Sequence, residues 1–266
     1  MVAPFTYVEG SILVRLVIAH CIADFFLQSN SAVKEKERKS FKSLHLWKHI
    51  LIVIVLTTAL VFNLHYLSQI IVIGATHLLI DVGKVFALKK YNKNKEAVIN
   101  LWLFLFDQML HIAVIIVVWL WIIEGWVKIK FLFEVNLPNY RFLIRVLGYI
   151  VVIGPVSYLI RFLTDKWATD LDKSDDGLQD AGLWIGFLER TLILTLVFIE
   201  QYTAIGFLVA AKSILRLIDK PERSKVSLEE QFFSSRQHTE YVLIGTFLSF
   251  SFALIIGLLI NFLLKF

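Results

Sequence analysis

Residues 100–123 read NLWLFLFDQMLHIAVIIVVWLWII, and this stretch decides how the rest of the chain is interpreted. As a helix with a rise of about 1.5 Å per residue, it is long enough to cross the roughly 30 Å hydrocarbon core of a bilayer. Its only ionisable side chains are Asp107 and His111, which are four residues apart and therefore share one helix face. Ionisable groups inside an apolar span are costly, so the pair indicates a functional site.

The same spacing occurs twice more in apolar segments, as His20-Cys-Ile-Ala-Asp24 and His77-Leu-Leu-Ile-Asp81, with the order of the two residues reversed. Each pair can point at one spot on its helix face. A single pair is explained equally well by a local hydrogen bond, whereas three pairs favour one common polar site.

The composition supports an integral membrane protein. The chain has 266 residues, of which 58% are hydrophobic and 18% charged, and its mean hydropathy is +0.71. Soluble domains average roughly 45–50% apolar and about 25% charged residues. The apolar runs are continuous rather than alternating, which favours helices over a membrane barrel. The single cysteine, Cys21, rules out an internal disulfide.

The predicted fold is therefore all-α, a polytopic membrane bundle of seven or eight transmembrane helices. The spans lie at about 11–28, 47–62, 67–88, 100–123, 142–163, 183–199, 204–218 and 241–264. One helix over 183–218 would be roughly 54 Å long, so two short spans are expected there, and a reentrant hairpin stays open as an alternative.

Three parts of the chain are distinguished by composition. Residues 1–163 form an N-terminal bundle that carries the His/Asp pairs, 164–182 an acidic cytoplasmic linker, and 183–266 the C-terminal membrane helices.

The basic residues lie in loops, where membrane orientation explains the net charge of +5 better than nucleic-acid binding does. The loops at 29–47 and 89–99 are the most basic, so the positive-inside rule places both in the cytoplasm and the N-terminus outside. With this orientation in the membrane, the aspartate of each pair lies nearer the cytoplasm. The histidine lies about one helix turn, roughly 6 Å, deeper in the bilayer.

Imidazoles and carboxylates that converge in a low-dielectric region are a metal-ligand set suited to zinc or manganese. The predicted ligands are His20, Asp24, His49, His77, Asp81, Asp107 and His111, which suit one ion or two. One of the three aspartates, Asp24, Asp81 or Asp107, would act as the catalytic base. Candidate substrate-binding residues are Lys84, Gln28 and Gln108. Each also has a simpler interpretation, as a snorkelling lysine or a polar group at a helix end.

These motifs together resemble the bacterial membrane family known as domain of unknown function 3307. The resemblance covers about the first 125 residues and rests on His20 to Gln28, His49, His77 to Lys84 and Asp107 to His111. It implies a multi-pass protein of the bacterial cytoplasmic (inner) membrane, with no established activity.

The leading hypothesis is a metal-dependent membrane hydrolase that acts from the cytoplasmic side on a lipid or phosphate-ester substrate. The same ligands suit a metal-ion or proton transporter or channel, and a non-catalytic membrane sensor or partner protein is the third hypothesis. The residues alone do not decide whether the protein is an enzyme.

Overall fold

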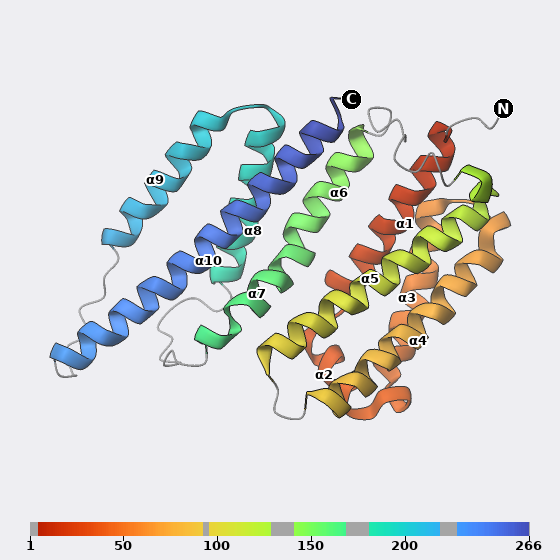
Figure 1. Cartoon of the computed structure of the whole chain (residues 1–266), viewed down its shortest axis with the longest axis horizontal. Coiled ribbons are helices and arrows are strands. Elements are labelled where there is room, and N and C mark those ends of the chain that lie inside the picture. The colour runs from red at the N-terminus through yellow and green to blue at the C-terminus, as the bar shows by residue number, and fades with distance from the viewer. Residues whose placement is uncertain (1–4, 93–95, 129–140, 169–180, 219–227, 266) are drawn as a thin grey trace. The chain divides into compact units, whose positions relative to one another are not determined.

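The computed structural model describes residues 5–92, 96–128, 141–168, 181–218 and 228–265, and within these ranges the chain is helical and contains no strand. The helices, in order, are α1 (Tyr7–Phe25), α2 (Asn30–Lys39), η1 (Ser40–Lys42), α3 (Leu44–Val61), η2 (Leu64–Tyr66), α4 (Leu67–Tyr91), α5 (Ala97–Ile122), α6 (Arg141–Ile153), α7 (Pro155–Ala168), α8 (Ala181–Phe198), α9 (Tyr202–Ile218) and α10 (Leu228–Leu263). Figure 1 shows their course. The all-helical prediction is confirmed over the described residues.

The chain divides into two compact units. The first comprises residues 1–155 with 263–266, and the second comprises residues 156–262. Most of the acidic linker proposed from composition, residues 169–180, lies outside the described residues, and α7 remains helical to Ala168.

The described helices support fewer membrane spans than the sequence predicts. Five are long and apolar enough to cross a bilayer, or six if the bent pair α1 and α2 counts as one span. The five are Leu44–Val61, Leu64–Tyr91, Val98–Ile122, Arg141–Asp165 and Glu240–Leu263. Helix α1 counts only together with the segment Asn30–Lys42, at an angle of 83° to it. The predicted seven or eight spans are not confirmed.

The predicted break within residues 183–218 is confirmed, because α8 and α9 are separate helices. Glu200 ends α8 in the left-handed conformation, with φ of 60°. The backbone N–H of Gln201 then donates to the carbonyl of Leu196 at 2.8 Å, a typical helix C-terminal hydrogen bond. The amide of Asn261 in α10 also donates to the carbonyl of Val197. The chain therefore turns between α8 and α9 at a point where carbonyl groups at the end of α8 accept hydrogen bonds.

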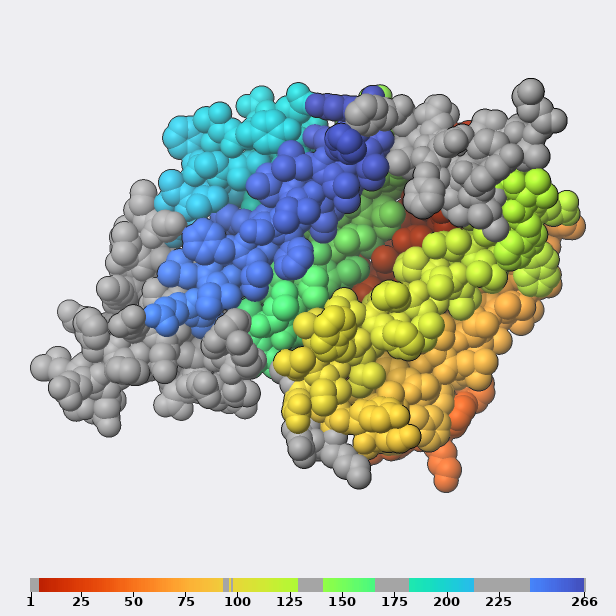
Figure 2. Space-filling model, in the orientation of Figure 1, coloured from red at the N-terminus to blue at the C-terminus, as the bar shows by residue number. Residues whose placement is uncertain are grey.

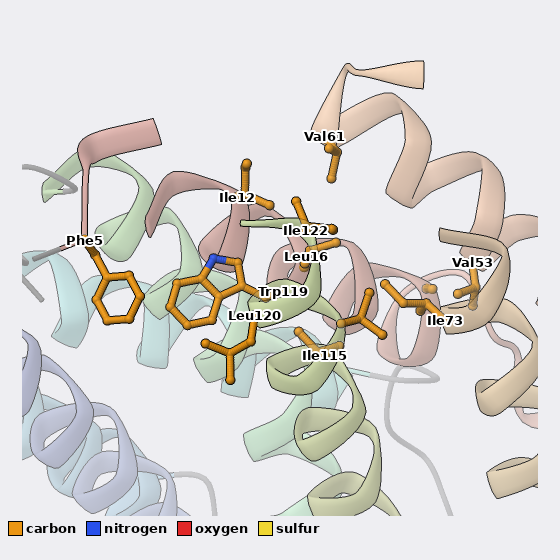
Figure 3. Close-up of a cluster of buried hydrophobic side chains, with 12 residues drawn as sticks. Phe5, Ile12, Leu16, Val53, Val61, Ile73, Ile115, Trp119, Leu120 and Ile122 are labelled. Atoms are coloured by element: carbon orange, nitrogen blue, oxygen red, sulfur yellow. The ribbon is translucent and has the colours of Figure 1, made fainter. Parts of the chain in front are cut away.

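The apolar core of the first unit lies toward the N-terminal end of α1 and the C-terminal end of α5. Trp119, fully buried, packs against Phe5 and donates its indole N–H to the carbonyl of Glu9 at 2.6 Å. Figure 3 shows this tryptophan among the surrounding apolar side chains. The Glu9 carboxylate also accepts a hydrogen bond from Lys128 at 2.7 Å and closes a capping box with Thr6. The start of α1 is thereby tied to the end of α5.

At the other end of the first unit, a helix replaces a predicted loop. The sequence predicts a basic loop over residues 29–47, but Asn30–Lys39 form α2, which packs against α3 and α4. Ser29 caps this helix through a bond from the backbone N–H of Ala32. The five basic residues made this segment look like a loop, although a serine suited to cap a helix, Ser29, is followed by a run of helix-forming residues. Figure 1 shows α2 beside the end of α4.

The second unit contains its own buried polar contacts. Glu189 of α8 forms an ion pair with Lys212 of α9. Arg190 is buried and donates to the hydroxyl oxygens of Ser249 and Ser157. These bonds link α8 to α9, α10 and α7, which is a structural role.

Candidate metal centre

The His/Asp residues converge because each lies on the buried stripe of its helix. In α5 the buried stripe contains Phe104, Asp107, His111, Ile115 and Val118, which follow the three- and four-residue spacing of one helix face. The corresponding stripes on the other helices include His20 on α1, His49 on α3, and His77 and Asp81 on α4. Side chains of α4 and α5 form a continuous surface on the face seen in Figure 2. The centre is therefore built into the helix packing of the first unit.

Three ligand atoms form a tight triangle. The Asp24 Oδ1 atom lies 3.3 Å from His49 Nε2 and 3.3 Å from His77 Nε2. The two imidazole nitrogens are 3.0 Å apart. Ligands bound tetrahedrally at about 2.0–2.1 Å stand roughly 3.3–3.4 Å from one another, so this triangle has nearly the dimensions of one face of a zinc coordination sphere.

His20 completes this group from α1. Its Nδ1 lies 3.7 Å from Asp24 Oδ1, and its Nε2 lies 3.2 Å from the amide oxygen of Gln108. The amide nitrogen of Gln108 donates to Asp107 Oδ2 at 3.1 Å, which fixes the orientation of the amide. The amide oxygen can then only accept, so Nε2 of a neutral His20 carries the proton and Nδ1 keeps its lone pair.

The same reasoning applies to His111. Its Nδ1 lies 2.8 Å from the backbone carbonyl oxygen of Asp107, and a carbonyl oxygen only accepts. Nδ1 is therefore the protonated nitrogen, and Nε2 presents a lone pair. A metal-binding histidine is commonly held in this way, with its second nitrogen bonded to a carbonyl or carboxylate.

Two lysines form salt bridges with two of the carboxylates. Lys36 of α2 is 2.7 Å from Asp81 Oδ2, and both side chains are more than nine-tenths buried. Lys84 of α4 is 2.8 Å from Asp107 Oδ2, with 29% of the lysine side chain and 3% of the aspartate side chain exposed. Buried carboxylates need such partners, because removing them from water is costly.

The donor set fits a divalent metal ion. Three groups of residues hold ligand atoms within 4.8 Å of one another: His20, Asp24 and His77; His49, His77 and Asp81; and Asp81, Asp107 and His111. Among the described residues, five of these side chains have a buried nitrogen or oxygen atom without a hydrogen-bond partner: His20 Nδ1, Asp24 Oδ1, His49 Nδ1, Asp107 Oδ1 and His111 Nε2. Unsatisfied buried polar atoms that face one another are a reason to infer a missing ion.

The structure thus brings together all seven residues predicted as ligands: His20, Asp24, His49, His77, Asp81, Asp107 and His111. Gln108 and Lys84 touch the centre through Asp107. Gln28 lies beyond the end of α1, and its buried amide nitrogen has no partner in the described part of the chain. The catalytic, metal-binding and substrate-binding roles stay predictions.

The sequence analysis did not single out Lys36, which lies in the predicted basic loop at residues 29–47. The available signal was amphipathic spacing in a short helix, since Ala32 and Lys36 are four residues apart and are the buried residues of α2. Its contact with Asp81 could not be predicted from local sequence, because the two residues are 45 positions apart in the chain.

A small cavity adjoins the histidines. His20, His77 and His111 line it together with Leu16, Val53, Thr57, Ile73, Thr76, Ile80, Val114 and Ile115. Apart from the three imidazoles and two threonine hydroxyls, its lining is apolar. The polar centre therefore gives way to apolar packing on this side.

These features define a helical protein with several apolar helices and a buried His/Asp cluster able to hold a metal ion. Residues 12–138 match the model of the family described as "Protein of unknown function (DUF3307)". The resemblance drawn from the motifs is confirmed. Searches of curated proteins and of solved structures give no significant match.

Proposed function

We propose that the first unit contains a membrane-embedded metal centre and that the protein is a metal-dependent hydrolase. The observation that carries this proposal is the triangle of Asp24, His49 and His77, with ligand atoms 3.0–3.3 Å apart and His20 beside it. A divalent ion held there would act as a Lewis acid and lower the pKa of a bound water. Zinc and manganese suit this mixture of nitrogen and oxygen ligands.

The membrane assignment rests on the five or six apolar helices. Large apolar side chains cover their outer faces, including Leu51, Val55, Leu79, Trp102 and Phe106. A soluble protein rarely exposes so many large apolar groups, whereas lipid-facing helices require them. The bacterial cytoplasmic membrane is the location we propose.

The centre lies toward the basic end of the first unit. Lys89 of α4 reaches the carbonyl of Arg38 and the hydroxyl of Ser40, close to the helix that carries Lys36. By the positive-inside rule this end faces the cytoplasm, which places the N-terminus outside and gives access from the cytoplasmic side.

The two lysines favour a phosphate ester as substrate. The ammonium groups of Lys36 and Lys84 lie beside the centre, on the carboxylates of Asp81 and Asp107, where they can also donate hydrogen bonds to a phosphate. Hydroxide would attack phosphorus, the bond to the leaving oxygen would break, and Lys84 or a protonated aspartate would donate a proton to that oxygen. A centre within apolar helices gives access to a lipid-linked ester.

A transporter or channel uses the same ligand types, but the cavity beyond the histidines argues against a transit path. Toward Val53, Ile73 and Ile115 it is lined mainly by apolar side chains. A hydrated ion or a proton needs polar groups or water along its route. A metal site closed on this side fits an enzyme better.

Metal analysis of the purified protein tests the proposal. We expect bound zinc or manganese and metal-dependent release of product from a lipid phosphate, and both should be lost when His77→Ala and Asp107→Ala are combined. A matched double variant, His65→Ala with Glu37→Ala, changes a histidine and a carboxylate at exposed positions and should keep both. Absence of metal under every loading condition contradicts a metal centre, and metal flux into liposomes without hydrolysis favours transport.

A further inference from the structure

The seven candidate ligands separate into two groups of different chemistry. His20, Asp24, His49 and His77 form a histidine-rich group around Asp24 Oδ1. Asp81, Asp107 and His111 form a carboxylate-rich group whose ligand atoms lie within 4.8 Å of one another. The two groups share no residue. Among the described residues, the histidine-rich group contains three buried side-chain atoms without a hydrogen-bond partner, and the carboxylate-rich group contains two.

The lysines divide in the same way. Lys36 contacts Asp81 and Lys84 contacts Asp107, so both ammonium groups lie against the carboxylate-rich group. The carboxylate of the histidine-rich group, Asp24, has imidazoles around it. An ion can enter the histidine-rich group without displacing an ammonium group, whereas an ion entering the other group must displace one or both.

We propose that the centre binds two metal ions in sequence, a tight one in the histidine-rich group and a weaker one in the carboxylate-rich group that displaces Lys36 and Lys84. This inference rests on the proposed metal centre and goes beyond it in the number, place and order of the ions. The first site has the ligands that zinc prefers, and the oxygen-rich second site suits manganese or magnesium. Asp81 lies between the groups, since its Oδ2 is 3.9 Å from His49 Nε2, and a carboxylate there can bridge two ions.

The charge balance explains why the second ion binds more weakly. With neutral imidazoles, three carboxylates and two ammonium groups leave one net negative charge, so the first divalent ion already makes the centre positive. A second ion meets this positive charge and two tethered ammonium groups. Like charges a few ångströms apart repel more strongly in a partly buried site than they do in water.

The experiment is a metal titration of the full-length protein in detergent, first with zinc and then with manganese, followed by calorimetry and by metal content at saturation. We expect two ions per chain in two separate steps. Asp107→Asn and Asp81→Asn should each remove the second step only, and Asp24→Asn should remove the first. Size-exclusion elution and helical circular dichroism identify variants that have not folded.

Variants of the two lysines test the proposal independently in the same metal titration. Lys36→Gln and Lys84→Gln should each tighten the second step by roughly tenfold or more, and should leave the first step within about twofold. Lys39→Gln on the exposed side of α2 is the matched control and should change neither step.

The outcomes separate the two proposals. Two ions per chain with the lysine effect support the inference. One ion per chain at saturation leaves the metal centre standing but overturns the second site. No bound ion overturns both. Two steps that the lysine variants do not affect overturn the displacement of the ammonium groups.

Discussion

Lys36 occupies a position that lysine rarely takes. Its ammonium group lies 2.7 Å from Asp81 Oδ2, and only 8% of its side chain is exposed. Lysines and aspartates are almost never buried unless they are paired. The pair contributes little net stability by itself, but removing one member leaves a buried charge without compensation.

Lys36→Met should therefore destabilise the metal-free protein by about 3–5 kcal/mol, because the Asp81 carboxylate loses its counter-charge. Added zinc or manganese should restore most of this loss, since an ion takes over the compensation. Unfolding followed by circular dichroism in a titration of denaturing detergent measures both effects. Lys39→Met, which breaks only the exposed pair with Glu35, should cost less than about 1 kcal/mol. Equal losses in the two variants would refute the role given to Lys36.

Gln108 fixes the tautomer of a neutral His20, because its amide oxygen can only accept the hydrogen bond from Nε2. Gln108→Leu should weaken metal binding by about 10- to 100-fold, as the loss of groups that orient metal ligands does elsewhere. Competition with a chromogenic chelator measures this affinity. Gln69→Leu on α4 is the control, because Gln69 contacts the exposed Ser68. Unchanged affinity in Gln108→Leu would show that His20 needs no support from the amide.

At the residue scale, the sequence spacing predicted which side chains come together, and their role as metal ligands stays a prediction. The pairs His20/Asp24, His77/Asp81 and Asp107/His111 are each set by one helix turn, which a sequence displays directly. The partners of the lysines depend on contacts 45 and 23 residues apart in the chain, and no local pattern encodes them.

At the scale of helices, α3 and α4 approach closely at a glycine. An added Cβ at Gly74 would meet the Cγ1 and Cδ1 atoms of Ile54 at 2.6 and 2.7 Å. Isoleucine has little χ1 freedom in a helix, so it cannot move aside without strain. Gly83, nine residues further along α4, has open space at the same point.

Gly74→Ala should therefore destabilise the protein by about 1–3 kcal/mol through overpacking. Gly83→Ala should be neutral or stabilising by up to about 1 kcal/mol, because alanine is the better helix former. The difference between the two variants in the free energy of unfolding isolates the effect of the close approach. Gly74→Ala should also weaken metal binding, since α3 and α4 carry His49 and His77. If both variants unfold alike, helix approach at Gly74 does not limit stability.

The sequence located the helix positions of the first unit well but misread the segment between α1 and α3. A run of lysines looks the same in a loop and in a short helix, and only packing against α3 and α4 shows that α2 is ordered. Conversely, the division between α8 and α9 was predictable, because Glu200-Gln201-Tyr202 interrupts two apolar runs.

At the scale of the whole molecule, the charges at the two ends of the first unit differ. Exposed basic residues cluster around α2, η1 and the end of α4, including Lys34, Arg38, Lys39, Lys42 and Lys89. Lys128, an exception to the positive-inside pattern, is paired with Glu9 at the opposite end. Its charge is thereby neutralised locally, which removes the conflict with the orientation that the loops predict.

This orientation predicts which end reacts from outside the cell. In a protein whose Cys21 is replaced by serine, Asn63→Cys at the end of α3 should react with a membrane-impermeant maleimide in intact cells. Glu37→Cys on α2 should react only after the membrane is opened, because the basic end faces the cytoplasm. Gel-shift detection of the label checks both. The reverse pattern would invert the topology, and labelling of both positions would show that the first unit does not cross the membrane.

The number of spans was the least predictable property of the whole chain. Hydropathy marks apolar segments, but it does not show that α1 turns by 83° into α2. That angle depends on contacts with the rest of the bundle.

The two lysines at the carboxylates have a consequence for ion selectivity. Each ammonium group is a cation of charge one, tethered beside its carboxylate and therefore present at a high effective concentration. Sodium and potassium ions carry the same charge and gain nothing by exchanging with it, whereas a divalent ion gains a second unit of attraction. In the proposed metal centre, the lysines would thus act as tethered competitors that exclude monovalent ions and give way only to multivalent ones.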